Sequence, residues 1–168
     1  MTLPSVMLDR LGTSEEELAR LLILDVHEIF STMIGMEDRK HAPVSIAPMN
    51  LFKESVTALV GLVGTYSGIV SLHVSRPLAC KITSRVLDMT ITGVNENVLD
   101  AVGEIANMIT GSFKMHLSPG GSDIRISTPS VVTGDEYIIS LSGAYDTMTL
   151  LYDIDGEWLM VAVAIERE

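Results

Sequence analysis

The sequence predicts a single α+β domain built around an antiparallel sheet. Helical and strand-like patterns follow one another in the order helix, strands, helix, helix, strands. The strand-like segments are joined by short connections, which favours antiparallel pairing over parallel crossover units. The 168 residues fit one ordinary domain, and no linker rich in Pro, Gly or Ser interrupts them. We therefore expect one domain over residues 1–168.

Three segments have the apolar spacing of amphipathic helices. Residues 14–36 form the first, which begins with a capping box made by Ser14 and Glu17. Residues 76–89 predict a shorter helix, and a second long helix is predicted over about 95–116. The sheet should therefore be flanked by two long helices and a shorter third helix.

Strand-like patterns fill most of the remaining sequence. The predicted strands are 44–46, 56–63, 68–74, 123–132, 137–142, 147–154 and 158–165. Two tight connections, Gly134–Asp135 and Asp155–Gly156, have the composition of hairpin turns.

The charge balance excludes several classes of partner. Eleven basic and 22 acidic residues give a net charge of −11. This field disfavours binding to nucleic acid or to an anionic membrane surface. No apolar stretch reaches the 18 residues or so that a membrane-spanning helix needs. The mean hydropathy of +0.36 indicates an additional buried face, such as a subunit interface.

Cysteine and histidine usage argues against a metal site. The lone Cys80 excludes an intramolecular disulfide and any Cys-based zinc cluster, and it fits a reducing, cytoplasmic compartment. No two histidines lie at i, i+4 with a carboxylate partner. The first residues lack the basic region and apolar run of a secretory signal. We therefore expect no metal centre and a cytoplasmic protein.

The two long helices resemble each other. Residues 26–35 align with 102–111 at an offset of 76, with a slip of one residue near the end. The similarity predicts duplicated helix-plus-strands units over about 14–75 and 95–168, unless two amphipathic helices are alike by chance. The copies differ chemically, since Ser31 stands where the second copy has Asn107.

The second long helix carries a compact set of polar residues. At about 100° per residue, Asp100, Glu104, Asn107 and Gly111 fall within an arc of roughly 60°. The apolar side chains Val98, Val102, Ile105, Ile109 and Phe113 cluster on the opposite side. Because the apolar face must face the core, the polar residues should form an exposed ridge.

This ridge could be either a solvated helix face or half of an active site. Glu104 is an anion that can pair with a Lys or Arg of a partner. The amide of Asn107 can hold a water molecule in line with an electrophile, as positioned amides do in phosphoryl transfer. Neither residue is a nucleophile, so a partner would have to supply the electrophile and any Mg²⁺.

At these residues the sequence resembles the CheC/CheX family of chemotaxis phosphatases, and CheX-like proteins in particular. The family motif is Asp or Ser, three residues, Glu, two residues, Asn, and a Pro a little over twenty residues later. Asp100, Glu104 and Asn107 match its helical part, and Pro129 follows Asn107 by 22 positions. The order of the predicted elements matches the family over nearly the whole chain, which implies a CheC-like fold.

The resemblance implies an activity and a division of roles. The family removes the phosphoryl group from the aspartyl phosphate of the response regulator CheY. Asn107 would orient the attacking water, Glu104 would dock a Lys of the regulator, and Asp100 and Pro129 would be supporting motif positions. The Mg²⁺ would belong to the regulator, and the chain would need no cofactor of its own. Glu28 and Ser31 would be a degenerate first copy, as in single-site members, which form homodimers.

A second hypothesis comes from a different class of protein. The same duplicated architecture resembles components of the flagellar switch, which would make the chain a non-catalytic binding or scaffold module in chemotaxis or two-component signalling. A pure scaffold would not need the Glu104 and Asn107 pair. A third hypothesis, a small-ligand sensor in the strand-rich half, finds no convergent polar cluster in the sequence.

Overall fold

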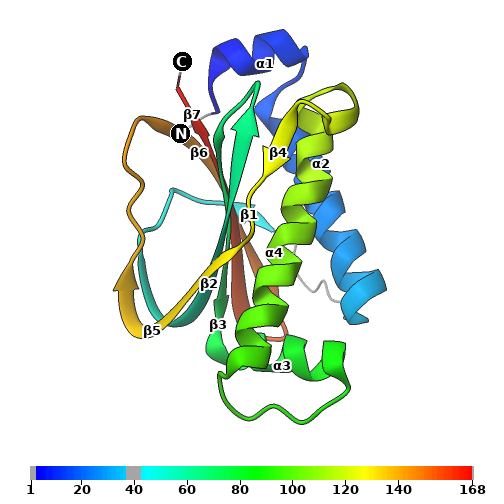
Figure 1. Cartoon of the computed structure of the whole chain (residues 1–168), viewed down its shortest axis with the longest axis vertical. Coiled ribbons are helices and arrows are strands. Elements are labelled where there is room, and N and C mark those ends of the chain that lie inside the picture. The colour runs from blue at the N-terminus through cyan, green and yellow to red at the C-terminus, as the bar shows by residue number, and fades with distance from the viewer. Residues whose placement is uncertain (1–2, 37–42, 168) are drawn as a thin grey trace.

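The computed structural model describes residues 3–36 and 43–167 of the chain. It consists of one sheet whose helix-covered face packs against α2 and α4, with α3 at one end of the sheet and α1 at the other (Figure 1). The helical elements are α1 (Ser5–Leu11), α2 (Glu15–Ile29), the π-helical turn η1 (Phe30–Ile34), α3 (Arg76–Leu87), α4 (Glu96–Leu117) and the 3₁₀ turn η2 (Pro119–Gly121). The strands are β1 (Val44–Ser45), β2 (Leu51–Gly64), β3 (Gly68–Ser75), β4 (Ile124–Ile126), β5 (Ser130–Ile138), β6 (Tyr145–Ile154) and β7 (Glu157–Glu166). None of the described helices is both long and apolar enough to cross a membrane.

The predicted α+β class and the antiparallel sheet are confirmed. The strand order is β1-β6-β7-β3-β2-β4, and β5 also pairs with β2. Strands β3 and β7 lie at the centre and pair antiparallel, with Val70 opposite Val163 and Leu72 opposite Val161. Each half of the chain contributes an edge to the other half, because β1 pairs with β6 and β5 pairs with β2.

The core lies between the helices and one face of the sheet. Successive side chains of a strand point to opposite faces, so alternate residues of β3 join the core cluster. These are Val70, Leu72 and Val74, each at most 2% exposed. On the opposite face of the same strand lie Ser71 and His73, which are also buried although no helix covers them.

The first long helix has a predicted start and an unpredicted end. The Ser14 hydroxyl accepts a hydrogen bond from the Glu17 backbone N–H at 3.2 Å, which confirms the predicted cap. Regular α-helical geometry ends at Ile29, and the next turn, Phe30–Ile34, is a π-helix. Gly35 then ends the element at φ 67°, a left-handed conformation that glycine adopts without strain.

One of the two predicted hairpin turns is confirmed. Asp155 and Gly156 connect β6 to β7, and their φ values of 54° and 80° are both positive. Positive φ at both central residues is the signature of the tight turn that matches the twist of a hairpin.

The other predicted turn, at Gly134–Asp135, is wrong. Strand β5 continues through these residues, with Gly134 opposite Ser55 and Glu136 opposite Lys53 of β2. Glu54 lies between the two paired positions of β2 at φ 45°, so the irregularity falls on the neighbouring strand. Pairing with the long β2 edge overrides the local turn tendency of a Gly-Asp pair.

The strands around this region also differ from the prediction. The predicted strand 123–132 is divided into β4 and the start of β5. The predicted strand 137–142 was too long, because β5 ends at Ile138 and residues 139–142 follow it. The short helix α1, in which Met7 is buried, was not predicted.

Candidate functional site on helix α4

Local sequence signals fix where α4 begins and place charged residues at both of its ends. The Asn95 side chain accepts a hydrogen bond from the Val98 backbone N–H at 3.2 Å, which satisfies one of the free donors of the first turn. Glu96 lies in the first turn, and Lys114 and His116 lie in the last. The charges of Glu96 and Lys114 oppose the partial charges of the helix ends and stabilise the helix.

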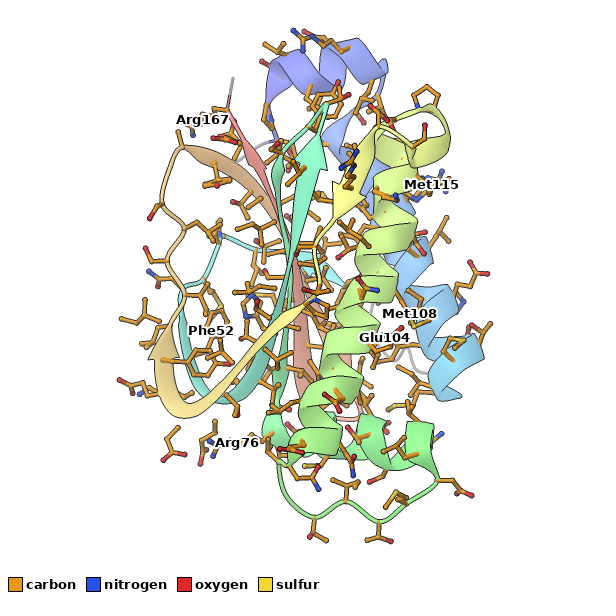
Figure 2. All side chains as sticks on the ribbon, in the orientation of Figure 1. Phe52, Arg76, Glu104, Met108, Met115 and Arg167 are labelled. Atoms are coloured by element: carbon orange, nitrogen blue, oxygen red, sulfur yellow. The ribbon has the colours of Figure 1, made fainter. Side chains whose placement is uncertain are left out.

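The structure exposes the ridge that the helical spacing predicts. Asp100 and Glu104 are exposed, whereas Asn107 and Gly111 are half-buried. The other sides of α4 are enclosed by α2, α3 and the sheet. Its buried residues are Val98, Ala101, Val102, Gly103, Ile105, Ala106, Ile109, Thr110, Phe113 and Leu117. Figure 2 labels Glu104 and Met108 on α4, of which Glu104 is exposed and Met108 is half-buried against the core.

The polar groups of the ridge are free of internal partners. Within residues 3–36 and 43–167, the side chains of Asp100, Glu104 and Asn107 make no hydrogen bond or ion pair. A carboxylate and an amide are therefore presented three residues apart with their full bonding capacity available. This arrangement can bind a cation and hold a water molecule, provided that both come with a partner.

Pro129 lies against the same helix. A Cβ atom built on Gly103 would lie 3.5 Å from Cγ of Pro129 and 3.2 Å from Cγ2 of Val131. The segment that enters β5 therefore packs against the α4 backbone beside Glu104. The structure thus brings Pro129 to α4, one helical turn before Asn107.

The predicted degenerate copy lies at the end of α2. Glu28 is exposed, and Ser31 lies in the π-helical turn. The Ser31 hydroxyl donates to the backbone oxygen of Glu28 at 3.3 Å, and the Thr32 hydroxyl donates to the same oxygen at 2.6 Å. Both hydroxyls thus bond to their own helix, which the sequence comparison did not predict.

A hydrogen-bonded pair of side chains joins the two long helices. Nε2 of His116 on α4 lies 2.9 Å from Oδ2 of Asp25 on α2. Burial raises the pKa of Asp25, and the neighbouring His116 opposes that rise. Sequence analysis did not predict this pair, because the two residues are 91 positions apart.

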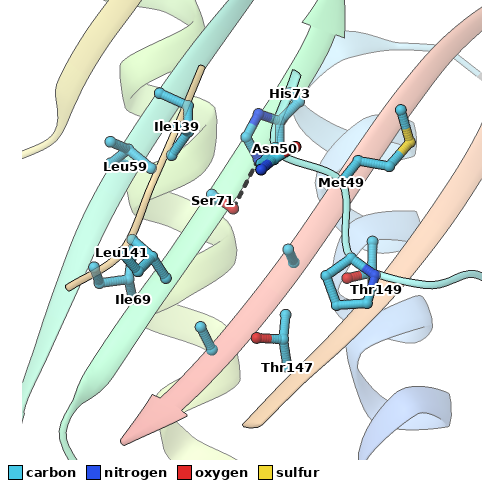
Figure 3. Close-up of a pocket in the computed structure, with 13 residues that line it drawn as sticks. Met49, Asn50, Leu59, Ile69, Ser71, His73, Ile139, Leu141, Thr147 and Thr149 are labelled. Atoms are coloured by element: carbon cyan, nitrogen blue, oxygen red, sulfur yellow. Dashed lines mark hydrogen bonds between the residues drawn. The ribbon is translucent and has the colours of Figure 1, made fainter. Parts of the chain in front are cut away.

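The sheet face that no helix covers contains a hollow of about 300 Å³ (Figure 3). Its lining includes Asn50, Ser71, His73 and Thr149. The Thr149 hydroxyl is buried without a hydrogen-bond partner among the described residues. Polar groups from separate strands therefore do converge here, contrary to the expectation from the sequence.

His73 is the most perturbed group beside this hollow. Its ring nitrogens lie 2.8 Å from the Thr57 hydroxyl and 2.9 Å from the Ser71 hydroxyl, and the ring stacks on Phe52 at 4.1 Å. Burial lowers the pKa of His73 to about 3, so the ring is neutral at physiological pH. Thr57 is also bonded to the Tyr137 hydroxyl at 2.8 Å, so the network ties β3 through β2 to β5.

Within the described part of the chain, no three His, Cys, Asp or Glu side chains come together as a metal-binding group. Burial raises the pKa of the Cys80 thiol, which is half-buried beside the core. The chemistry of the ridge therefore rests on Glu104, Asn107 and whatever a partner contributes.

Comparisons with known proteins show which family the chain belongs to. The family model described as chemotaxis phosphatase CheX matches residues 56–152. The CheY-P phosphatase CheX of Thermotoga maritima is 26% identical over 130 residues, which cover 77% of this chain and 83% of that protein.

Solved structures show the same fold. The chemotaxis protein CheX from Desulfovibrio desulfuricans superimposes with a TM-score of 0.76 at 27% identity, covering 89% of this chain and 99% of that one. The complex of CheX with CheY, BeF₃ and Mg²⁺ from Borrelia burgdorferi matches in fold with a TM-score of 0.71 at 17% identity, covering 89% of this chain and 98% of that one. Since the family model covers more than half of the sequence, this chain belongs to the CheX family of chemotaxis phosphatases.

Proposed function

We propose that this protein accelerates hydrolysis of the aspartyl phosphate of CheY or a related response regulator. The observation that carries the proposal is the pair formed by the exposed Glu104 and the half-buried Asn107 on α4, whose side chains have no internal partner among the described residues. The Thermotoga maritima relative is named a CheY-P phosphatase, which supports the same substrate class.

In this mechanism Asn107 enters the active site of the regulator. Its amide group holds a water molecule in line with the phosphorus atom, as positioned amides do in other phosphoryl transfers. Water attacks phosphorus, the bond to the aspartyl carboxylate oxygen breaks, and inorganic phosphate leaves. The side chains of this ridge form no covalent bond, which fits a site that contains no nucleophile.

Glu104 docks the complex by pairing with a Lys of the regulator. A net charge of −11 gives no general attraction to a regulator whose phosphorylation pocket is itself acidic. Binding must therefore rest on local pairing, and an unpartnered carboxylate one helical turn before Asn107 can supply it. Asp100 continues the same ridge, and Pro129 supports α4 from the side of the sheet.

The Mg²⁺ in this proposal belongs to the regulator. The Borrelia burgdorferi complex contains Mg²⁺ together with CheY, by its name. The ion would neutralise charge on the phosphoryl oxygens, and this chain would contribute only the water-orienting amide and the docking carboxylate. We also propose a cytoplasmic location, where response regulators of two-component signalling are found.

The phosphatase hypothesis is tested with a phosphorylated receiver domain, ideally CheY from the same organism. We expect wild-type protein to accelerate loss of the aspartyl phosphate and Asn107→Ala to lose about 100-fold or more in kcat, as removal of one positioned polar group does elsewhere. Ser31→Ala is the matched control from the first copy and should behave as wild type.

Three results would contradict the hypothesis in different ways. Full activity of Asn107→Ala would remove the proposed role of Asn107. A wild-type protein that accelerates hydrolysis on none of the receivers of the organism would remove the phosphatase function. A wild-type protein that binds a receiver without turnover would identify the scaffold module as the better account.

We further propose that the protein forms a homodimer. Large apolar side chains remain exposed around the paired ends of β2 and β5, where Leu51 is 43% and Ile138 is 67% exposed. Covering them would account for the high mean hydropathy of the chain. Sedimentation equilibrium tests the idea, and a monomer for both wild type and Ile138→Asp would refute it.

A further inference from the structure

Helix α4 contains two glycines in its interior, Gly103 and Gly111. Neither has positive φ, so the backbone conformation does not call for glycine at either position. In a helix interior glycine is less favourable than alanine, because it loses more backbone freedom on folding. Each of the two glycines therefore needs another reason.

For Gly103 the reason lies inside the chain. A Cβ atom there would come within 3.2 Å of Val131 and 3.5 Å of Pro129. Such contacts are tighter than those usual in a packed core, so a methyl group would push β5 away from the helix. Gly103 permits the close approach of β5 to α4.

For Gly111 the chain offers no such reason. A Cβ atom at this position would meet no heavy atom of the described residues within 4 Å, apart from its own helix backbone and its sequence neighbours. The residue is only half-buried and lies on the ridge with Glu104 and Asn107. Alanine would fit there and would make the isolated helix more stable.

The position of Gly111 explains why a side chain would nevertheless interfere. Residue 111 lies four positions after Asn107, on the same face of the helix and one turn away. Side chains of an α-helix lean toward its N-terminus, so a side chain at 111 would cover the surface beside Asn107. Because the Asn107 side chain is short, its amide can reach into a partner only if the partner comes close to the helix backbone.

We propose that the absence of a side chain at Gly111 lets the main chain of a phosphorylated receiver domain come against α4 beside Asn107. This inference rests on the proposed phosphatase function and extends the docking surface one turn beyond the catalytic pair. Met115 is exposed and lies on the following turn in Figure 2. Its side chain would add an apolar contact to the same docking surface.

The test uses Gly111→Ala and the bulkier Gly111→Leu in the full-length protein. Gly111→Ala should raise the Tm of the free protein by about 2–4 °C, since alanine favours the helix. It should also raise the KM for the phosphorylated receiver about tenfold, as overpacking at a tight contact does. Gly111→Leu should abolish detectable turnover while the free protein stays folded.

Gly103→Ala is the matched contrast within the same helix. It should lower the Tm, because its methyl group meets β5 in the folded chain, and Val131→Ala should restore part of the loss by making room. A gain of stability combined with a loss of affinity is thus expected at Gly111 alone.

The proposal fails if Gly111→Ala leaves KM within twofold of wild type, or if it destabilises the free protein. Wild-type activity, measured in the same assay, is the control for both results. An inactive wild type would refute the proposed function itself, whereas an active wild type with an equally active Gly111→Ala would refute only the close approach at Gly111.

Discussion

Helices α2 and α4 cover the same face of the sheet, but they differ where the sequence comparison aligns Ser31 with Asn107. Helix α4 stays regular from Glu96 to Leu117, whereas α2 passes into a π-helical turn at Phe30–Ile34. A π-helix bonds each residue to the fifth along the chain, so its turn holds about one residue more than an α-helical turn. The single-residue slip in the alignment of the two helices falls in this turn.

The difference accounts for how one copy could lose a site. We propose that the two helix-plus-strands units arose by duplication, which the reciprocal pairing of β1 with β6 and of β5 with β2 supports. The wider π-helical turn in the first copy rotates the residues after Ile29 relative to Glu28. The Ser31 hydroxyl then bonds to the backbone of Glu28, whereas Asn107 keeps its amide free among the described residues. A motif on a helix thus depends on unbroken helical geometry as well as on residue identity.

The largest expected effect comes from reversing charge on one helix and then on the other. Glu104→Arg should weaken binding of the phosphorylated receiver about 100-fold, because a like charge would face the docking Lys. Glu28→Arg makes the same change on α2 and should alter the Kd by less than about twofold, as expected for an exposed residue outside the interface. Titration of a labelled receiver with each variant measures both values. Equal losses would show that α2 also docks the partner.

A smaller effect separates the stability of the sheet from the function of the ridge. The pKa of His73 is lowered to about 3, so the unfolded chain takes up a proton below about pH 6.5 while the folded chain does not. The stability is therefore complete above pH 6.5 and is lost as the pH falls toward 3. We expect the free energy of unfolding to drop by about 2 kcal/mol between pH 7 and pH 5 through this residue.

Denaturant unfolding at a series of pH values tests this expectation with a matched pair of variants. His73→Gln should flatten the dependence on pH between 5 and 7, even though it lowers stability at both ends. Thr149→Val removes a non-titrating hydroxyl that lines the same hollow and should keep the wild-type slope. If His73→Gln keeps that slope as well, the buried ring is not the group that titrates.

The smallest expected effect is that of moving the amide to the first copy, which should not restore the phosphatase activity lost in Asn107→Ala. Introducing Ser31→Asn into Asn107→Ala supplies the missing amide to the first copy, but the π-helical turn places it out of register with Glu28. Phosphatase activity of the double variant should therefore stay within about twofold of that of Asn107→Ala. If the first copy had regular α-helical geometry, the added amide would restore the activity about 100-fold. Recovery of activity would break the comparison, since it would mean that side-chain identity alone separates the two helices.

The sequence predicted features whose causes are local. The ridge of α4 depends only on helical spacing, and its exposed members Asp100 and Glu104 were predicted from periodicity. The cap at Ser14 and the turn at Asp155–Gly156 depend on residues that are neighbours in the sequence. In each case the physical cause lies within a few residues.

Features that depend on distant strands could not be predicted in the same way. The Gly134–Asp135 pair has turn composition, but the edge of β2 keeps it in an extended strand. The hydrogen bonds from Thr57 to His73 and to Tyr137 exist only because the sheet register aligns three strands. The Phe30–Ile34 turn has ordinary helical composition, and the sequence analysis did not predict its π-helical geometry.

The exchange of edge strands also bears on how the chain reaches its native state. Strand β1 completes the sheet edge beside β6, and β5 lies along β2, so neither half of the chain has all its strand partners within its own sequence. Pairings between such distant segments form late, because the loop that they close must first be ordered. An isolated half would expose unpaired strand edges, which are prone to aggregate. The two halves are thus obliged to fold as a cooperative unit, and this keeps α4 and its ridge in place whenever the sheet is intact.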